Sequence, residues 1–218
     1  MVKISVITAV YNARNSIEKA LKSVLSQTYD NFELIVIDGA STDGTSEIIE
    51  NFKDNISIFI SEPDDGIYDA LNKGIKCATG DVIGFLHADD VFENNDILSK
   101  LAKAFLNSEL DAVYGDLVYV SKNNPANILR YWNSGRYSRE MLKRGWMPPH
   151  TTFYCRRSAY IEMGMFDVSF DIAADYDCML RFLTSKKFSC GNIPEVLVRM
   201  CVGGKSNQSL SNILKKSV

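Results

Sequence analysis

The feature that most constrains the fold is the alternation of short apolar, β-rich segments with segments of helical periodicity. Residues 3–10 (KISVITAV) and 32–38 (FELIVID) are almost continuously apolar, as expected for strands buried on both faces of a sheet. Between them, residues 16–26 repeat apolar side chains at helical spacing. Strands that alternate with helices of this length predict βαβ units and a mostly parallel sheet flanked by helices.

The same alternation continues to residue 120 and then becomes looser. Further strands are expected at 56–60, 82–86, 111–120, 151–155 and 195–202. Further helices are expected at 42–52, 67–78, 96–105, 157–163 and 175–184. The fold class is therefore α/β.

The composition is that of an ordinary globular protein. The chain has 218 residues, of which 46% are apolar and 23% are charged. No apolar stretch reaches the length of a transmembrane helix, and the N-terminus has too few residues before its apolar run for a secretory signal. We therefore expect a cytoplasmic protein. Its five cysteines are widely spaced and lack a CxxC pair, which predicts reduced thiols.

Charge is distributed unevenly along the chain. Residues 1–116 contain 9 Lys/Arg and 20 Asp/Glu, whereas residues 117–218 contain 15 Lys/Arg and 7 Asp/Glu. Between Asp116 and Glu162 the only acid is Glu140, against eight basic residues. This segment suits either a solvated basic surface or contact with phosphates or an anionic membrane.

Three of the predicted strands end in polar residues. The first ends at Thr8–Tyr11, the second at Asp38, and the fourth is followed by Asp89 and Asp90. Ligands of parallel sheets bind at the carboxyl ends of the strands, so these residues form a candidate site. Adjacent carboxylates repel each other unless a cation lies between them, and they suit Mg²⁺ or Mn²⁺. The alternative is that one of them caps the following helix.

Several common site motifs are absent from the sequence. There is no GxGxxG dinucleotide-binding motif and no GxSxG nucleophile elbow. Gly39 and Gly44 have the spacing of a phosphate-binding P-loop, but Thr45 stands where that loop requires lysine. The only histidines are His87 and His150, and there is no HExxH motif, which argues against a zinc site built from His and Cys.

The ordered series of segments resembles family 2 glycosyltransferases of the GT-A fold. The matching segments are SVITAVYNARNSIEKALKSVLSQTYDNFELIVIDGASTDGT, then GIYDALNKGIKCATGDVIGFLHADD, then GMFDVSF and DIAADYDCMLRF. Together they extend over the chain up to residue 204. The resemblance implies a Rossmann-like central sheet and a role in bacterial polysaccharide or glycolipid biosynthesis at the cell envelope.

The resemblance also implies a role for individual residues. Asp90 would bind Mn²⁺ or Mg²⁺, which offsets the charge of the leaving nucleoside diphosphate. The nucleotide-sugar, expected to be a UDP-sugar, would be bound by Thr8, Tyr11, Asp38, Asn72 and Asp89.

Asp175 matches the acceptor-side base of the family. Such a base takes the proton of the acceptor hydroxyl, and its position opposite the leaving group implies inversion at the anomeric carbon. The alternative is that Asp175 caps the helix that follows it. His150 and Trp146 are further acceptor-side candidates, although packing is an equally ordinary role for both.

The sequence departs from the commonest family pattern at three places. Gly39 stands where a second aspartate is usual, and Leu71 stands where an arginine is usual. Ala174 replaces the glutamate that usually precedes the base. These changes affect the expected details of donor binding more than the class of the protein.

The predicted function is an inverting, metal-dependent hexosyl or N-acetylhexosaminyl transfer to a glycan or lipid-linked acceptor. The predicted divisions are a nucleotide-sugar-binding half (1–116), an acceptor-side half of the same domain (117–204) and a basic tail (205–218). Peripheral contact with the inner face of the cell membrane is expected, and nucleic acid is not an expected partner. The alternatives are a nucleotidyltransferase, disfavoured because no Gly-rich, basic phosphate loop follows the first strand, and a non-catalytic sugar-nucleotide-binding module.

Overall fold

The computed structural model describes residues 1–122 and 124–202. The basic tail expected at 205–218 lies outside the described residues. The strands are β1 (Ile4–Val10), β2 (Phe32–Asp38), β3 (Ile58–Ser61), β4 (Val82–Phe85), β5 (Asp90–Phe92), β6 (Ala112–Val120), β7 (Ile128–Trp132), β8 (Tyr154–Arg156) and β9 (Cys190–Cys201). The helices are α1 (Ile17–Leu25), α2 (Thr45–Glu50), α3 (Ile67–Cys77), α4 (Ile97–Ala104), α5 (Arg139–Leu142), α6 (Arg157–Met163) and α7 (Ala174–Thr184), with single 3₁₀ turns at Lys53–Asn55 (η1) and His150–Thr152 (η2).

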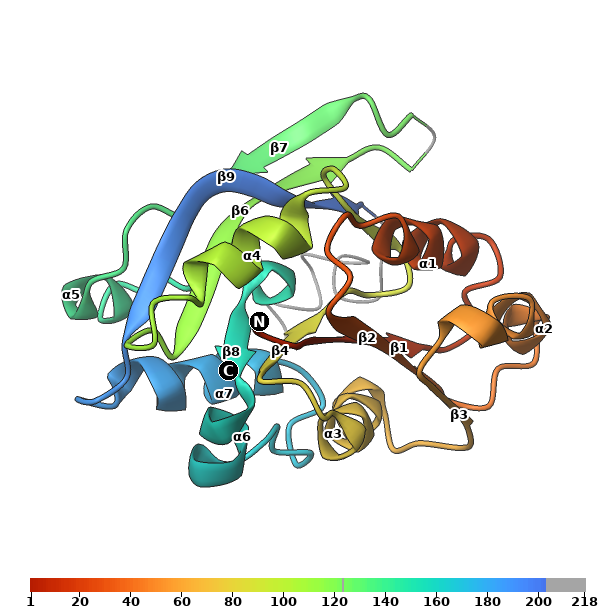
Figure 1. The fold of residues 1–218 in the computed structure, drawn as a ribbon, viewed down its shortest axis with the longest axis horizontal. Helices are drawn as coiled ribbons and strands as arrows, with labels where there is room; N and C mark the ends of the chain where they lie inside the picture. The colour runs from red at the N-terminus through yellow and green to blue at the C-terminus, as the bar shows by residue number, and fades with distance from the viewer. Residues whose placement is uncertain (123, 203–218) are drawn as a thin grey trace, which may run out of the picture.

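The first half of the chain forms a parallel sheet, as the sequence predicts. Strands β3, β2, β1 and β4 lie in this order, and each neighbouring pair is parallel. Every residue of β1 is buried, because helices cover both faces of the sheet. Figure 1 shows these strands side by side. Their carboxyl ends therefore meet at one edge.

The second half extends the same sheet with antiparallel strands. β8 joins β4 to β6 in antiparallel register, and β9 runs parallel to β6 while also pairing with β5. β9 bends strongly as it crosses the molecule (Figure 1). The sheet is thus parallel in its first half and mixed in its second half, and it connects the two halves into one core.

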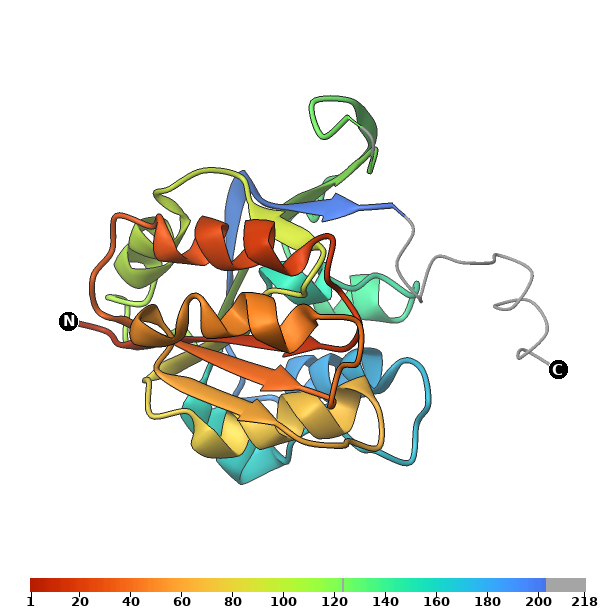
Figure 2. The same ribbon diagram turned by 90° about the vertical axis from the view of Figure 1, so that its right-hand side faces the viewer.

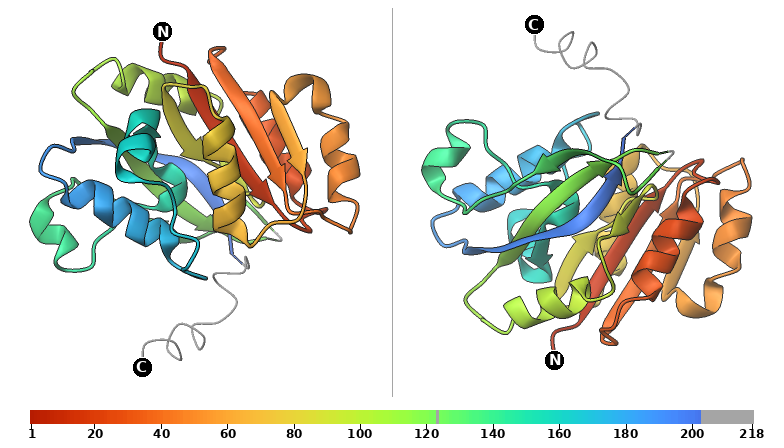
Figure 3. Two further views of the ribbon diagram at one scale, coloured as in Figure 1. Left: turned by 90° about the horizontal axis from the view of Figure 1, so that it is seen from below. Right: turned by 90° about the horizontal axis from the view of Figure 1, so that it is seen from above.

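Two hydrophobic layers hold the helices on the sheet. On one face, α1, α2 and α4 pack against the sheet through side chains such as Leu21, Ile49 and Leu101. On the other face, α3, α6 and α7 pack through side chains such as Leu71, Tyr160 and Phe182. Figures 2 and 3 show the helices on opposite sides of the strands.

The structure contains three elements that the sequence pattern does not predict: β5, β7 and α5. Each has at most five residues, too few to show a period. The helix expected at 42–52 is shorter because Asp43 accepts hydrogen bonds from the backbone and hydroxyl of Thr45, where α2 begins. The predicted division after residue 116 falls inside β6.

A charged network fixes the amino end of the parallel sheet. Glu33 in β2 is buried, and its carboxylate accepts hydrogen bonds from Ser5 Oγ, from Thr79 and from the backbone N–H of Gly80. The ammonium group of Lys3 lies 2.7 Å from Glu33 Oε2. Burial acts to raise the pKa of Glu33, but these partners outweigh it and lower the pKa from 4.5 to about 2.

We expect Glu33→Gln to lower the free energy of unfolding by about 2 kcal/mol at pH 7, because a network built around a buried anion loses its charge. The folded-state pKa is depressed, so the stabilisation is present above about pH 4.5 and is lost as the pH falls towards 2. Urea unfolding at several pH values measures the difference. Glu47→Gln, at an exposed position of α2, is the control. If the difference in stability between Glu33→Gln and wild type does not change with pH, the ionised carboxylate of Glu33 is not the source of the stabilisation.

Candidate functional site

The carboxyl ends of β1, β2 and β4 meet at one edge, as predicted. Tyr11 follows β1 and is 53% exposed, whereas Asp38 at the end of β2 is fully buried. The loops after the two strands are joined, since Asn12 N donates to Ser41 Oγ and Thr42 N donates to Asn12 Oδ1. The edge therefore has a fixed rim from which Tyr11 projects.

Asp38 organises the turn that follows β2. Its carboxylate accepts hydrogen bonds from the backbone and hydroxyl of Ser41, and from the hydroxyls of Ser46 and Ser61. Asp38 therefore stabilises this turn. The nucleotide contact expected for Asp38 stays a prediction.

A neighbouring loop supplies an acid where the family usually has one at position 39. The carboxylate of Asp64 fills the space that a side chain on Gly39 would occupy. Asp64 Oδ1 accepts a hydrogen bond from Gly66 N, while Oδ2 lies against Gly39. The missing acid is therefore replaced in space by Asp64. The sequence analysis missed this residue, because nothing in the order of residues shows that its loop packs on Gly39.

The two adjacent acids lie in a tight turn between β4 and β5. The backbone N–H of Asp90 donates to His87 O, and Asp90 begins β5, where it pairs with Met200 of β9. The next helix, α4, has Asp96 as its N-cap residue. Neither Asp89 nor Asp90 therefore caps that helix.

The carboxylate of Asp90 is fully buried without a partner. Its exposed fraction is 0%, and neither oxygen has a hydrogen-bond partner among the described residues. Burial raises the pKa of Asp90 well above its usual range, and the charge of Asp89 adds to this effect. The nearby backbone N–H of Cys201 acts to lower the pKa of Asp90, but it does not form a hydrogen bond with the carboxylate. Burial also raises the pKa of Asp89.

These properties fit a divalent cation. A buried carboxylate with two unpartnered oxygens is a hard anionic ligand that lacks its counter-charge, and an adjacent acid can share the same cation. Residues 1–122 and 124–202 contain no group of three or more His, Cys, Asp or Glu side chains arranged to hold a metal. Asp90 and Asp89 would leave the other positions of such a cation open for substrate oxygens.

The two histidines lie together beside the acids. The rings of His87 and His150 are 5.6 Å apart, and His150 stacks on Phe85 at 5.1 Å. Burial lowers the pKa of both, that of His87 to about 3, with a further contribution from His150. The charge of Asp175 acts on both pKa values in the opposite direction, which shows that it lies near them. The histidines thus lie between the end of β4 and the start of α7.

Asp175 is held by a tyrosine on another helix. Its Oδ1 accepts a hydrogen bond from Tyr68 Oη at 3.0 Å, and the same hydroxyl accepts one from Ala173 N. Burial raises the pKa of Tyr68 to about 12, and the charge of Asp175 contributes. The N-cap residue of α7 is Ala173, so Asp175 does not occupy the cap position. Tyr68 is a positioning residue that the sequence analysis missed.

Asn72 lies one turn further along α3 and makes a second contact with the acceptor side. Its amide donates to Phe166 O at 2.9 Å and accepts from Phe166 N at 3.0 Å. Both ends of the amide are therefore used to dock the GMFD segment onto α3. The structure gives Asn72 a positioning role, and its expected contact with the nucleotide-sugar stays a prediction.

Two other candidates are located inside the protein. Thr8 has an exposed fraction of 0%, and its hydroxyl is buried without a partner among the described residues, so its nucleotide contact also stays a prediction. Trp146 packs against Tyr114 and Tyr137 and donates from Nε1 to Ser134 O. Trp146 therefore packs within the protein, which is the alternative to a contact with the acceptor.

The family is decided by comparison with known sequences. The sequence model of glycosyl transferase family 2 matches residues 5–167. The chain belongs to glycosyl transferase family 2. A glycosyltransferase of PGL/p-HBAD biosynthesis from Mycobacterium bovis is 32% identical to it over 182 residues, which are 81% of this chain and 68% of the relative. The predicted family is thus confirmed, and the relative supports a role in glycosyl transfer.

The comparison with solved structures confirms the predicted fold class. TarS from S. aureus gives a TM-score of 0.72 at 20% identity, covering 92% of this chain and 37% of TarS. A mannosyltransferase from Pyrobaculum calidifontis, solved with GDP-Man and Mn²⁺, gives 0.71 at 20% identity, covering 94% of this chain and 59% of that chain. The protein therefore has the GT-A fold, and it spans only part of these neighbours. In the described residues, no helix is long and apolar enough to cross a membrane.

We expect Asp90→Asn to raise the free energy of unfolding by about 1–3 kcal/mol in the presence of EDTA, because the change removes an unpartnered buried charge. Adding Mn²⁺ is expected to stabilise the wild type but not the variant. Thermal unfolding with and without Mn²⁺ measures both effects. Asp65→Asn, at an exposed position in a neighbouring loop, should behave like wild type. Equal stabilisation of Asp90→Asn by Mn²⁺ would exclude Asp90 as a ligand.

Proposed function

We propose that the protein transfers a hexosyl or N-acetylhexosaminyl unit from a nucleotide-sugar to a hydroxyl of a glycan or glycolipid, with inversion. The observations that carry this proposal are an unpartnered buried acid, Asp90, in the first half of the chain and an acid held by Tyr68, Asp175, in the second half. The charge of Asp175 acts on His87, which lies three residues before Asp90. One acid suits a cation and the other suits proton transfer. Both groups are needed to displace a nucleoside diphosphate by a hydroxyl.

On the donor side, Asp90 and Asp89 would hold Mn²⁺ or Mg²⁺ beside the diphosphate. When bound, the cation supplies positive charge that offsets the negative charge developing on the leaving group. Tyr11, Asp38 and Asp64 border the adjacent edge and are suited to contact the nucleoside, together with the buried Thr8 and Asn72 as the sequence expects. Structures of TarS with UDP and with UDP-GlcNAc support a UDP-sugar as the donor.

On the acceptor side, Asp175 would take the proton of the attacking hydroxyl. Tyr68 binds Oδ1 and fixes the rotamer, and Oδ2 has no hydrogen-bond partner among the described residues. Oδ2 is therefore the oxygen suited to accept the proton. A base opposite the leaving group corresponds to a single in-line displacement, which inverts the anomeric carbon. The half-buried His87 and His150, whose pKa values are lowered, would shape the space on the acceptor side of Asp90.

We expect Asp175→Asn to lower transfer by about 10²–10⁴-fold while donor binding is unchanged, because the amide cannot accept the proton. Thermal shifts with UDP- and GDP-sugars, with and without Mn²⁺, identify the donor and measure its binding. Product release, with the anomeric configuration determined by NMR, measures transfer.

The matched control for this experiment is Asp177→Asn. Asp177 lies on the same helix but forms an ion pair with Arg181 at 2.9 Å. It is expected to retain transfer. Transfer by Asp175→Asn at the wild-type rate would refute the assignment of Asp175 as the base. If the wild type binds a donor but transfers sugar to no acceptor, the protein is a non-catalytic binding module.

The acceptor and the location follow from the basic half of the chain. The exposed bases Arg136, Lys143 and Arg144 suit a lipid diphosphate or an anionic membrane on the cytoplasmic side.

We expect the protein to bind anionic liposomes and to lose this binding when Arg136, Arg139, Lys143 and Arg144 are neutralised, because each base near the surface contributes about 1 kcal/mol. Sedimentation with phosphatidylserine vesicles measures the binding, and neutral vesicles are the control. Equal binding of both proteins, or no binding of the wild type, would reject membrane contact.

A further inference from the structure

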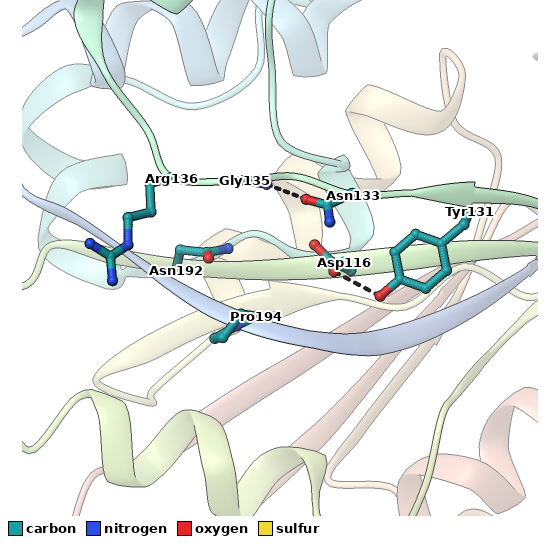
Figure 4. Close-up of a pocket in the computed structure, with 7 residues that line it drawn as sticks. All are labelled: Asp116, Tyr131, Asn133, Gly135, Arg136, Asn192 and Pro194. Atoms are coloured by element: carbon teal, nitrogen blue, oxygen red, sulfur yellow. Dashed lines mark hydrogen bonds between the residues drawn. The ribbon is translucent and has the colours of Figure 1, made fainter.

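A polar cavity of about 380 Å³ lies between β6, β9 and the segment after β7. Figure 4 shows the side chains that surround it. They include Asp116 from β6, Asn192 and Pro194 from β9, and Tyr131, Asn133 and Arg136 from β7 and the residues after it. None of the candidate residues for sugar transfer lines this cavity.

An irregularity in the sheet makes room for the cavity. Gly115 pairs with Ile193, but the next residue, Asp116, pairs with Val196. Two additional residues, Pro194 and Glu195, therefore bulge out of β9 at this point. Bulges of this kind interrupt the pairing of strands and redirect side chains, and they are common beside functional sites.

The opposite wall is held rigidly. Ser134 is buried; its backbone N–H donates to Asp116 Oδ1 and its hydroxyl donates to Gly115 O. Its carbonyl accepts from Trp146 Nε1, and the next residue, Gly135, accepts from Tyr114 Oη. The cavity is therefore formed before any ligand binds, and the packing position of Trp146 supports it.

Two polar residues of the cavity wall have unused hydrogen-bonding capacity. The amide nitrogen of Asn192 is buried and has no hydrogen-bond partner among the described residues. Asp116 is 4% exposed, and each of its oxygens accepts one hydrogen bond, from Tyr131 Oη and from Ser134 N. A carboxylate oxygen can accept more than one. Folding thus leaves an unsatisfied donor beside the cavity and unused acceptor capacity in its wall, which a native interior rarely does. Because the Asn192 nitrogen is buried, a ligand reaches it only when the Asn192 side chain turns towards the cavity.

The chemistry of these groups selects a neutral, hydroxyl-rich ligand. The lining carries one charge of each sign, on Asp116 and on Arg136, and Asp116 takes part in none of the ion pairs of the described residues. The charges of the lining therefore cancel, which gives an anion no advantage over a neutral ligand. A hydroxyl both donates and accepts, and it can satisfy Asp116 together with Asn192 or Arg136. The ring of Tyr131, 51% exposed, adds an apolar face. The volume falls in the range of small-molecule sites, about 300–1,000 Å³.

We infer that this cavity is a saccharide-binding subsite, distinct from the site of transfer, that holds a neutral sugar unit of the acceptor glycan. Alternate residues of a strand face the same way, so Asp116 lies on the face of β6 where Tyr114 packs in the layer that contains α7. Asp175 on α7 belongs to the same side of the sheet. The assignment of the occupant to the acceptor rests on the proposed function, whereas the saccharide chemistry of the cavity does not.

Saturation-transfer NMR on the full chain tests the subsite with maltotriose, cellotriose and chitotriose, without nucleotide or metal. We expect at least one trisaccharide to bind, and Asn192→Leu to weaken it about tenfold, equivalent to about 1.4 kcal/mol for the lost donor. Arg136→Met, at an exposed position, should also weaken binding without affecting the fold. Asn51→Leu makes the same change as Asn192→Leu at an exposed position beyond α2 and should bind like wild type. Thermal unfolding checks that each variant is folded.

The outcomes separate this inference from the proposed function. No binding of any trisaccharide, binding unaffected by both cavity variants, or displacement of the trisaccharide by millimolar inorganic phosphate would overturn the subsite. Sugar transfer to a simple hydroxyl acceptor in the absence of trisaccharide binding would leave the proposed function intact and refute the subsite. Binding that is lost in the cavity variants, in a protein that transfers no sugar, would support the subsite and refute the function.

Discussion

The arrangement of the candidate site depends on one face of α3, where two side chains one turn apart connect the halves of the chain. Asn72 binds both backbone groups of Phe166, and the hydroxyl of Tyr68 donates to Asp175 and accepts from the backbone N–H of Ala173. Because α3 is itself packed against β1 and β2 in the first half, these hydrogen bonds fix the acceptor side relative to the strand ends. These contacts join the half of the chain that carries Asp90 to the half that carries Asp175.

A second constraint is the burial of charge that folding does not neutralise. Glu33 is buried with several donors and a lysine, and its pKa falls. Asp90 is buried with no partner among the described residues, and its pKa rises. The contrast separates a carboxylate that stabilises the sheet from one that costs stability. A protein retains the second kind where a ligand compensates it, which is why Asp90 indicates function more strongly than the acidic pair in the sequence does.

Much of the first half of the fold was predictable from the sequence because its signals are local. Buried strands are continuously apolar, helices repeat with their own period, and the ends of parallel strands share an edge. The positions of Asp38, Asp89 and Asp90 at that edge follow from this. The short elements were less predictable: β5 and β7 have too few residues to show a period, and the pairing of β5 with β9 depends on contacts distant in sequence.

The sequence by itself determined the fold class, the family and the position of the acids at the ends of strands, since hydrophobic period and ordered motifs are properties of the chain alone. Only the tertiary structure decided which polar groups have partners. It showed Asp64 beside Gly39, Tyr68 on Asp175 and the unpartnered Asn192 at the bulge of β9. The physical reason is that satisfaction of a hydrogen-bonding group depends on atoms that folding brings from other segments, and no local pattern records them.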